Sequence, residues 1–204
     1  MTTLLQIQTS LFGTGGQSSQ LANQFAANWL EHNPDGRVVV RDLAQEPVPH
    51  LTAERFQAFI TPAERRTAEQ QAAVAHSDAL IEEIASADVI VLAVPMYNFS
   101  VPSTLRAYFD HIARVGVTFS YTANGPVGLI EGKKAYVFIT RGGVHPQAGD
   151  SQVPYLRQFL GFIGIKDVEF VLAEGLAMGD TMREQSLGAA RSEIARLAPV
   201  RLAA

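Results

Sequence analysis

The stretch that decides the fold is VIVLAVPMYNFSVPSTLRAYFDHI, residues 89–112. Residues 89–94 are all apolar, which is typical of a strand buried on both faces of a parallel sheet. Pro95 ends this strand, a polar and aromatic turn follows at 96–99, and a helix pattern starts after Pro102. Turns at the carboxyl ends of such strands carry the binding groups of many α/β proteins. We therefore expect the turn at 96–99 to line a binding site.

The alternation of strand and helix patterns continues through the chain. Further strands are expected at 4–9, 37–43, 135–140 and 168–172. Helices are expected from Ser18 or Ser19 as N-cap to about 32, and at 54–60, 67–87, 104–115, 155–163 and around 187–197, with an extended arm at 116–126 closed by an Asn-Gly-Pro turn. This rhythm predicts one α/β domain over 1–204, a three-layer sandwich around a five-stranded parallel sheet of order 2-1-3-4-5.

Composition excludes several classes of function. The chain has 204 residues, a net charge of -4 and no cysteine, so disulfides, thiolate metal sites and thiol nucleophiles are absent. The acidic balance argues against a nucleic-acid partner. No apolar run reaches the ~20 residues of a membrane span, and no secretory leader is recognisable, so we expect a cytoplasmic protein. The five histidines lack ligand spacing, so no metal site is expected.

The first candidate loop follows the first strand and is rich in Gly and Ser. Its ligand candidates are Ser10, Gly16, Gln17 and Ser18. Backbone N–H groups at the start of the following helix favour an anion, and the two hydroxyls can donate to phosphate oxygens. The loop matches neither the Walker pattern nor G-x-G-x-x-G. Phosphate binding and an ordinary solvated turn both remain open on this loop alone.

Two further loops follow the third and fourth strands. The turn of Met96, Tyr97, Asn98 and Phe99 combines peptide groups and an amide with two aromatic rings that can wall a flat ligand. Thr140, Arg141, Gly142 and Gly143 allow close backbone approach, and Arg141 can place positive charge near an electron-rich ring.

The predicted strand order brings these three loops to one crevice, because strands 1, 3 and 4 are neighbours. A ligand with a phosphate at one end and a flat heterocycle at the other, such as FMN, fits such a crevice. Aromatic residues of the core and a surface arginine are the plainer alternatives for the second and third loops.

Taken together, several motifs resemble the FMN-dependent NADH-azoreductases of the flavodoxin-like quinone reductase superfamily. The resemblance runs from the Ser10 loop to about Gly175. It rests on PMYNF (95–99), YFD (108–110), GVTF (116–119), NGP (124–126), RGG (141–143) and FLGFIG (159–164).

The resemblance implies a homodimer with one non-covalent FMN per protomer. It implies phosphate contacts from the first loop and ring contacts from the other two. The resemblance also places Tyr121 and Phe162 near the face of the flavin where the substrate binds, and Phe162 is able to enter this site from the partner subunit. His145 is a candidate proton donor at the rim of the site. NADH or NADPH would reduce the flavin, and a quinone or azo compound would reoxidise it, in ping-pong order.

One position departs from the family pattern, and two alternative functions remain open. The family often has serine where this chain has Gly16, which predicts weaker FMN binding. The Pro47 to Arg66 segment has no clear match. The alternatives are a flavodoxin-like electron carrier without its own substrate and an α/β scaffold or regulatory dimer with an empty crevice.

Overall fold

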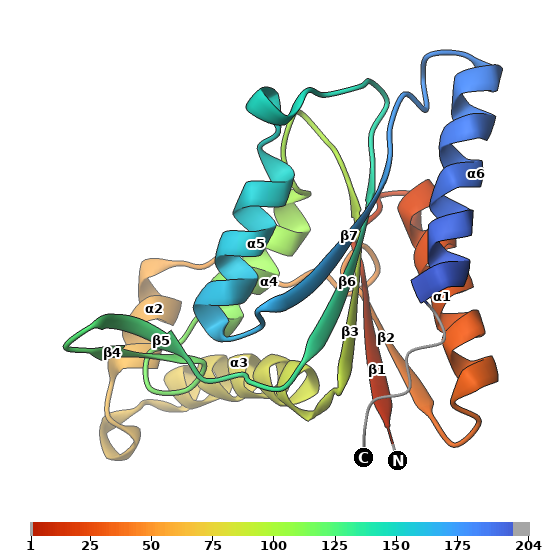
Figure 1. Cartoon of the computed structure of the whole chain (residues 1–204). Helices are drawn as coiled ribbons and strands as arrows, with labels where there is room; N and C mark the ends of the chain where they lie inside the picture. Colours follow the sequence, from red (N-terminus) through yellow and green to blue (C-terminus); the bar gives the residue numbers. More distant parts are fainter. Residues whose placement is uncertain (1, 198–204) are drawn as a thin grey trace.

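A five-stranded parallel sheet forms the centre of the computed structural model, which describes residues 2–197 (Figure 1). Its strands are β1 (Thr3–Gln8), β2 (Arg37–Asp42), β3 (Val89–Pro95), β6 (Lys134–Thr140) and β7 (Asp167–Ala173). They pair in parallel in the order β2-β1-β3-β6-β7. With the small hairpin β4–β5 left out of the count, this is the order 2-1-3-4-5, so the predicted fold class is confirmed.

Strand β3 occupies the middle of the sheet, and all seven of its residues are buried. Ala93 lies opposite Gln8 of β1 on one side and Phe138 of β6 on the other. Ile90 and Leu92 point into one apolar core, and Ala93 points into the other. A strand that is buried on both faces needs a continuous apolar sequence, and residues 89–94 of β3 provide one.

Helices cover both faces of the sheet (Figure 1). Helices α1 (Gln17–His32) and α6 (Asp180–Leu197) lie on one face, and α3 (Ala68–Ser86), α4 (Ser103–Ile112) and α5 (Gln152–Ile163) lie on the other. Helix α2 (Ala53–Ile60) packs against α3. Short 3-10 turns complete the connections: η1 (Gly13–Gly15), η2 (Ala63–Arg65) and η3 (Gln147–Gly149).

The start of α1 differs from the prediction. Its N-cap is Gly16, and no side chain caps it. Ser18 and Ser19, the expected caps, lie inside the first turn and are fully buried. The helix thus begins earlier than expected, because the η1 turn leads directly into it and leaves the serines facing inward.

The predicted arm is an antiparallel hairpin of β4 (Phe119–Thr122) and β5 (Gly125–Gly128), apart from the main sheet (Figure 1). Its turn is tighter than predicted, since Gly125 and Pro126 already belong to β5. The segment that follows β5 is hydrogen-bonded to the end of α5, where the Ile130 N–H donates to the Ile163 carbonyl at 2.9 Å. Among residues 2–197, no helix has the length and apolar character to cross a bilayer.

Candidate active site at the carboxyl ends of the central strands

The three predicted loops meet around one hollow of about 180 Å³ at the ends of β1, β3 and β6. Its lining combines residues from all three loops and one from the segment after β7. These residues are Ser10, Phe12, Gly16, Gln17, Pro95, Met96, Tyr97, Thr140, Arg141, Gly142 and Leu176. Phe12, Pro95 and Leu176 were not predicted; Phe12 is a large apolar residue left 77% exposed, a feature that only the structure reveals.

The first loop is organised around the Ser10 hydroxyl. Ser10 is 1% exposed, and its Oγ accepts the N–H of Phe12 at 3.2 Å. The η1 turn then folds Gly16 back onto Ser10, so closely that a Cβ at position 16 would lie 2.1 Å from the Ser10 Oγ and 2.6 Å from its Cβ. Only glycine allows this approach of the two segments without displacing Ser10.

The start of α1 fits a phosphate group. No side chain caps the helix, so its first-turn N–H groups lack the usual partner. The Ser18 Oγ is fully buried, yet it has no hydrogen-bond partner among the described residues, and neither has that of Ser19. A buried hydroxyl without a partner is costly, and an anion at the helix N-terminus would supply acceptors for it.

The second loop is a tight turn with an uncommon backbone. Tyr97 and Ser100 exchange two backbone hydrogen bonds, of 3.1 and 3.0 Å. Between them Asn98 and Phe99 have φ angles of 49° and 64°. Positive φ suits asparagine but strains phenylalanine, and Phe99 is 73% exposed, so little burial compensates the strain. Strain of this kind clusters at functional sites.

Tyr97 joins the second loop to the first. Its hydroxyl oxygen accepts the N–H of Leu11 at 3.2 Å and lies 3.5 Å from the Ser10 Oγ. The first and second loops are therefore connected by the Tyr97 side chain.

The third loop lines the hollow with Thr140, Arg141 and Gly142, and the Arg141 guanidinium is held by groups that are not part of this lining. Arg141 is 2% exposed, and its guanidinium donates to Gln152, to Asp150 and to Glu174. Two carboxylates therefore neutralise its charge. The positive charge predicted near an electron-rich ring is thus paired with Asp150 and Glu174, and the guanidinium holds the third loop in place.

The carboxylate of Asp150 depends on this arginine. Burial disfavours its charged form, but hydrogen bonds from the Arg141 guanidinium and from the N–H groups of Gln152 and Val153 outweigh burial and lower the pKa of Asp150. The ion pair with Arg141, at 2.7 Å, thus remains charged at neutral pH. It fixes the start of α5 against the third loop.

His145 and Phe99 form the rim. Their rings meet edge to face with centroids 6.0 Å apart. The His145 Nε2 lies 3.7 Å from the position that a Cβ on Gly143 would take, and its backbone N–H donates to Glu174 at 3.2 Å. His145 thus lies next to Gly143, directly after the lining residue Gly142, while Phe99, Gly143 and His145 are not themselves part of the lining.

A second hollow of about 420 Å³ is also lined by Tyr97 and includes Asn98. Its lining adds His50 and Arg106, which no sequence motif indicated. His50 belongs to the segment without a clear family match, which therefore forms one wall here.

Tyr121 and Phe162 do not line the hollow of their own chain. Both pack on Phe119, at centroid distances of 5.5 and 4.3 Å. The end of α5 precedes β7 directly, so Phe162 lies at the amino-terminal edge of the sheet (Figure 1). A seven-residue strand is ~20 Å long, so the amino-terminal edge of the sheet lies well away from the loops at its carboxyl edge.

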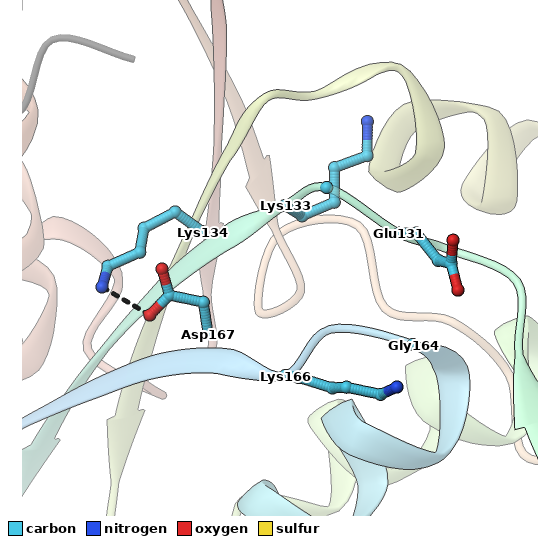
Figure 2. A pocket seen from close by; sticks show the side chains of 7 residues that line it. Glu131, Lys133, Lys134, Gly164, Lys166 and Asp167 are labelled. Carbon is cyan, nitrogen blue, oxygen red and sulfur yellow. Dashed lines mark hydrogen bonds and ion pairs between the residues drawn. The ribbon is translucent and has the colours of Figure 1, made fainter. Parts of the chain in front are cut away.

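A hollow of about 450 Å³ also lies at that opposite edge, where β6 and β7 begin. Figure 2 shows Lys133, Lys134 and Lys166 around it, with Lys134 held by Asp167 at 2.5 Å. It meets none of the three ligand loops. Within the described part of the chain, no three His, Asp or Glu residues are grouped so as to hold a metal ion.

A doubly wound parallel sheet whose strand-end loops form one phosphate-compatible hollow defines a flavodoxin-like protein. A model of the flavodoxin-like fold matches residues 2–198. The chain is 58% identical to an FMN-dependent NADH:quinone oxidoreductase of Cellvibrio japonicus, over 95% of this chain and 97% of that one. It is 54% identical to FMN-dependent NADH:quinone oxidoreductase 6 of Burkholderia lata, over 96% and 99%.

Comparison with solved structures supports the same family. An azoreductase from Bacillus anthracis strain Sterne superposes with a TM-score of 0.90 at 31% identity, covering 98% of this chain and 99% of that one. An FMN-dependent NADH-azoreductase from B. anthracis strain Ames Ancestor, in complex with FMN, gives 0.88 at 25% identity, covering 97% and 98%. The chain belongs to the FMN-dependent NADH-azoreductase family of flavodoxin-like proteins.

Proposed function

We propose that the protein is an FMN-dependent NADH:quinone oxidoreductase that also reduces azo compounds. The observation that carries this proposal is the meeting of the loops after β1, β3 and β6 around one hollow. The names of its relatives, quinone oxidoreductases and azoreductases, indicate the acceptors.

The predicted ligand residues in and around the hollow divide into a phosphate end and a ring end. Ser10, Gly16, Gln17 and Ser18 would hold the phosphate through hydroxyls and the first-turn N–H groups of α1. The segments 96–99 and 140–143 would contact the isoalloxazine ring largely through main-chain groups. Bound FMN supplies the chemistry by taking a hydride equivalent from NADH and passing it to the acceptor.

The protein itself positions the ring and shapes its open side. The neutralised Arg141 leaves the ring end without a free cation from this residue. Phe99 and His145 stand at the rim, where a flat donor or acceptor would enter. One open side used in turn by donor and acceptor gives ping-pong kinetics.

We also propose a homodimer in which Tyr121 and Phe162 complete the site of the partner subunit. In their own chain neither residue lines the hollow. Large apolar side chains are exposed around them: Val115 (55%), Val117 (41%), Val127 (42%) and Leu129 (45%), with Tyr121 itself 72% exposed. An exposed apolar surface of this kind suits contact with a second copy.

A steady-state assay tests the enzyme against the electron-carrier alternative. Purified protein loaded with FMN is mixed with NADH, and a quinone is then added. An oxidoreductase consumes NADH in proportion to the quinone over many turnovers, with parallel double-reciprocal lines. NADH consumption that stops after one equivalent per FMN would indicate a carrier.

A further inference from the structure

Gln152, the first residue of α5, is buried and makes contacts with two of the ligand loops. It is 0% exposed. Its Nε2 donates to the carbonyl oxygens of Pro95 and Ser100, both at 3.3 Å, and its Oε1 accepts from the Nε of Arg141 at 3.0 Å. A primary amide has two donor hydrogens and an acceptor oxygen, so all of its polar groups are engaged.

The two carbonyls that Gln152 binds lie at the two ends of the second loop. Pro95 closes β3, and Ser100 closes the turn that begins at Tyr97. The neighbouring Ser151 hydroxyl donates to the carbonyl of Phe99, inside the same turn. The start of α5 thus holds three carbonyls of a loop whose Phe99 has a strained φ of 64°. A strained turn persists only where its surroundings over-determine it.

On its other side, Gln152 contacts the arginine that braces the third loop. Arg141 also binds Asp150 and Glu174, at 2.7 and 3.0 Å, so it is a fixed group. One amide therefore connects the turn at 96–99 with the loop at 140–143, the two segments between which the isoalloxazine ring would lie.

The geometry points to Gln152 as a positioning residue that holds the two ring-contact loops in register and keeps the Asn98–Phe99 turn in its strained form. Its effect on the flavin rests on the proposed function; its effect on the turn does not. Gln152 reaches the ring only through the loops, because its side chain contacts Arg141, Pro95 and Ser100.

The first test uses the FMN-free protein and the variant Gln152→Met, which preserves length and volume but removes the amide. Amide hydrogen exchange is measured at Tyr97 and Ser100, whose N–H groups close the turn. We expect exchange about tenfold faster in the variant, the scale of one lost buried hydrogen bond. The control is Gln71→Met, at an exposed position of α3, which should leave both rates unchanged.

The second test uses the FMN-loaded protein and reads the visible circular dichroism of the flavin and the KM for quinone. Gln152→Met should change the dichroism and raise KM several-fold, while the Kd for FMN changes little because the phosphate loop is intact. Ser18→Ala should have the opposite effects. It should weaken FMN binding, and the dichroism of the FMN-saturated variant should match that of the wild type.

Two results would overturn the assignment: wild-type exchange at Tyr97 and Ser100 in Gln152→Met, or wild-type dichroism and KM in the same variant. If Gln152→Met does not fold, Gln152→Asn, which keeps a shorter amide, is measured in the same way, and wild-type behaviour of that folded variant in both tests would equally overturn it. A wild-type protein that binds no FMN would refute the proposed function but leave the exchange test valid.

Discussion

The hydroxyl of Tyr97 lies 3.5 Å from the hydroxyl of Ser10, although the two residues are 87 positions apart in the chain. This contact joins the loop after β1 to the loop after β3 at the mouth of the hollow. The two ends of the proposed FMN site are therefore in direct contact. We expect substitutions at the phosphate end to change FMN affinity and substitutions at the ring end to change the surroundings of the flavin.

Ser18→Ala should have opposite effects on the empty and the loaded protein. Removing a buried hydroxyl that lacks a partner should leave the FMN-free protein as stable or more stable, by up to about 1 kcal/mol. Losing a phosphate contact should weaken FMN binding by ~1 kcal/mol or somewhat more. Urea unfolding and a fluorescence titration with FMN measure the two quantities.

Ser19→Ala is the matched control, because the Ser19 hydroxyl is equally buried and equally without a partner in the described chain. It should change stability in the same direction and leave FMN affinity unaltered. Unchanged affinity in Ser18→Ala would remove this hydroxyl from the phosphate site.

Gly16→Ser should weaken FMN binding even though it adds a hydroxyl at the phosphate end. The new Cβ would lie 2.1 Å from the Ser10 Oγ and 2.6 Å from its Cβ, so Ser10 or the backbone at position 16 must shift. We expect a loss of at least about tenfold in FMN affinity, the scale of one displaced hydrogen-bonding group. Equilibrium dialysis with FMN measures it.

Gly15→Ser is the control for Gly16→Ser, since a Cβ at position 15 meets no atom within 4 Å. Its affinity should match the wild type. In the double variant Ser10→Gly/Gly16→Ser the steric conflict is gone, and part of the affinity should return. Tighter binding by Gly16→Ser alone would show that the space near Ser10 is not limiting.

Phe99→Gly should stabilise the protein and impair its activity. Glycine adopts the φ of 64° freely, so relief of strain should add about 1 kcal/mol to the free energy of unfolding. The rim loses its aromatic ring, so turnover of the quinone should fall. Phe99→Ala separates the two effects, because it loses the ring but keeps the strained φ. Equal stability of the Gly and Ala variants in urea unfolding would argue against strain at this turn.

Phe162→Ala should lower acceptor turnover while FMN stays bound. If Phe162 completes the partner's site, its loss should reduce kcat/KM for quinone by about tenfold, equivalent to ~1.4 kcal/mol. Sedimentation and an FMN titration should match the wild type. Loss of FMN or of folding in this variant would place Phe162 in the core and contradict the proposed role.

Long apolar runs and strand-end loops made the fold and the meeting of the three loops around one hollow predictable from sequence. Residues 89–94 can be buried on both faces only in a central strand, and the sheet order then places the loops at 10–18, 96–99 and 140–143 together. Such arguments use only local pattern and topology.

Side-chain direction was not predictable, because it depends on partners elsewhere in the chain. Arg141 follows a strand like a ligand residue, but Asp150 and Glu174 take up its charge. Ser18 was expected to cap α1, but the η1 turn starts the helix at Gln17 and buries it. The φ angles of Asn98 and Phe99 likewise depend on the hydrogen bonds that close their turn.

In the proposed function, one flavin at the ends of β1, β3 and β6 serves donor and acceptor in turn. The visible absorption spectrum of the purified protein, supplemented with FMN, tests it directly. We expect a stoichiometric flavin band that NADH bleaches without oxygen and that an added quinone restores. A colourless protein that stays colourless when FMN is offered, or a bound flavin that NADH does not bleach, would contradict the account.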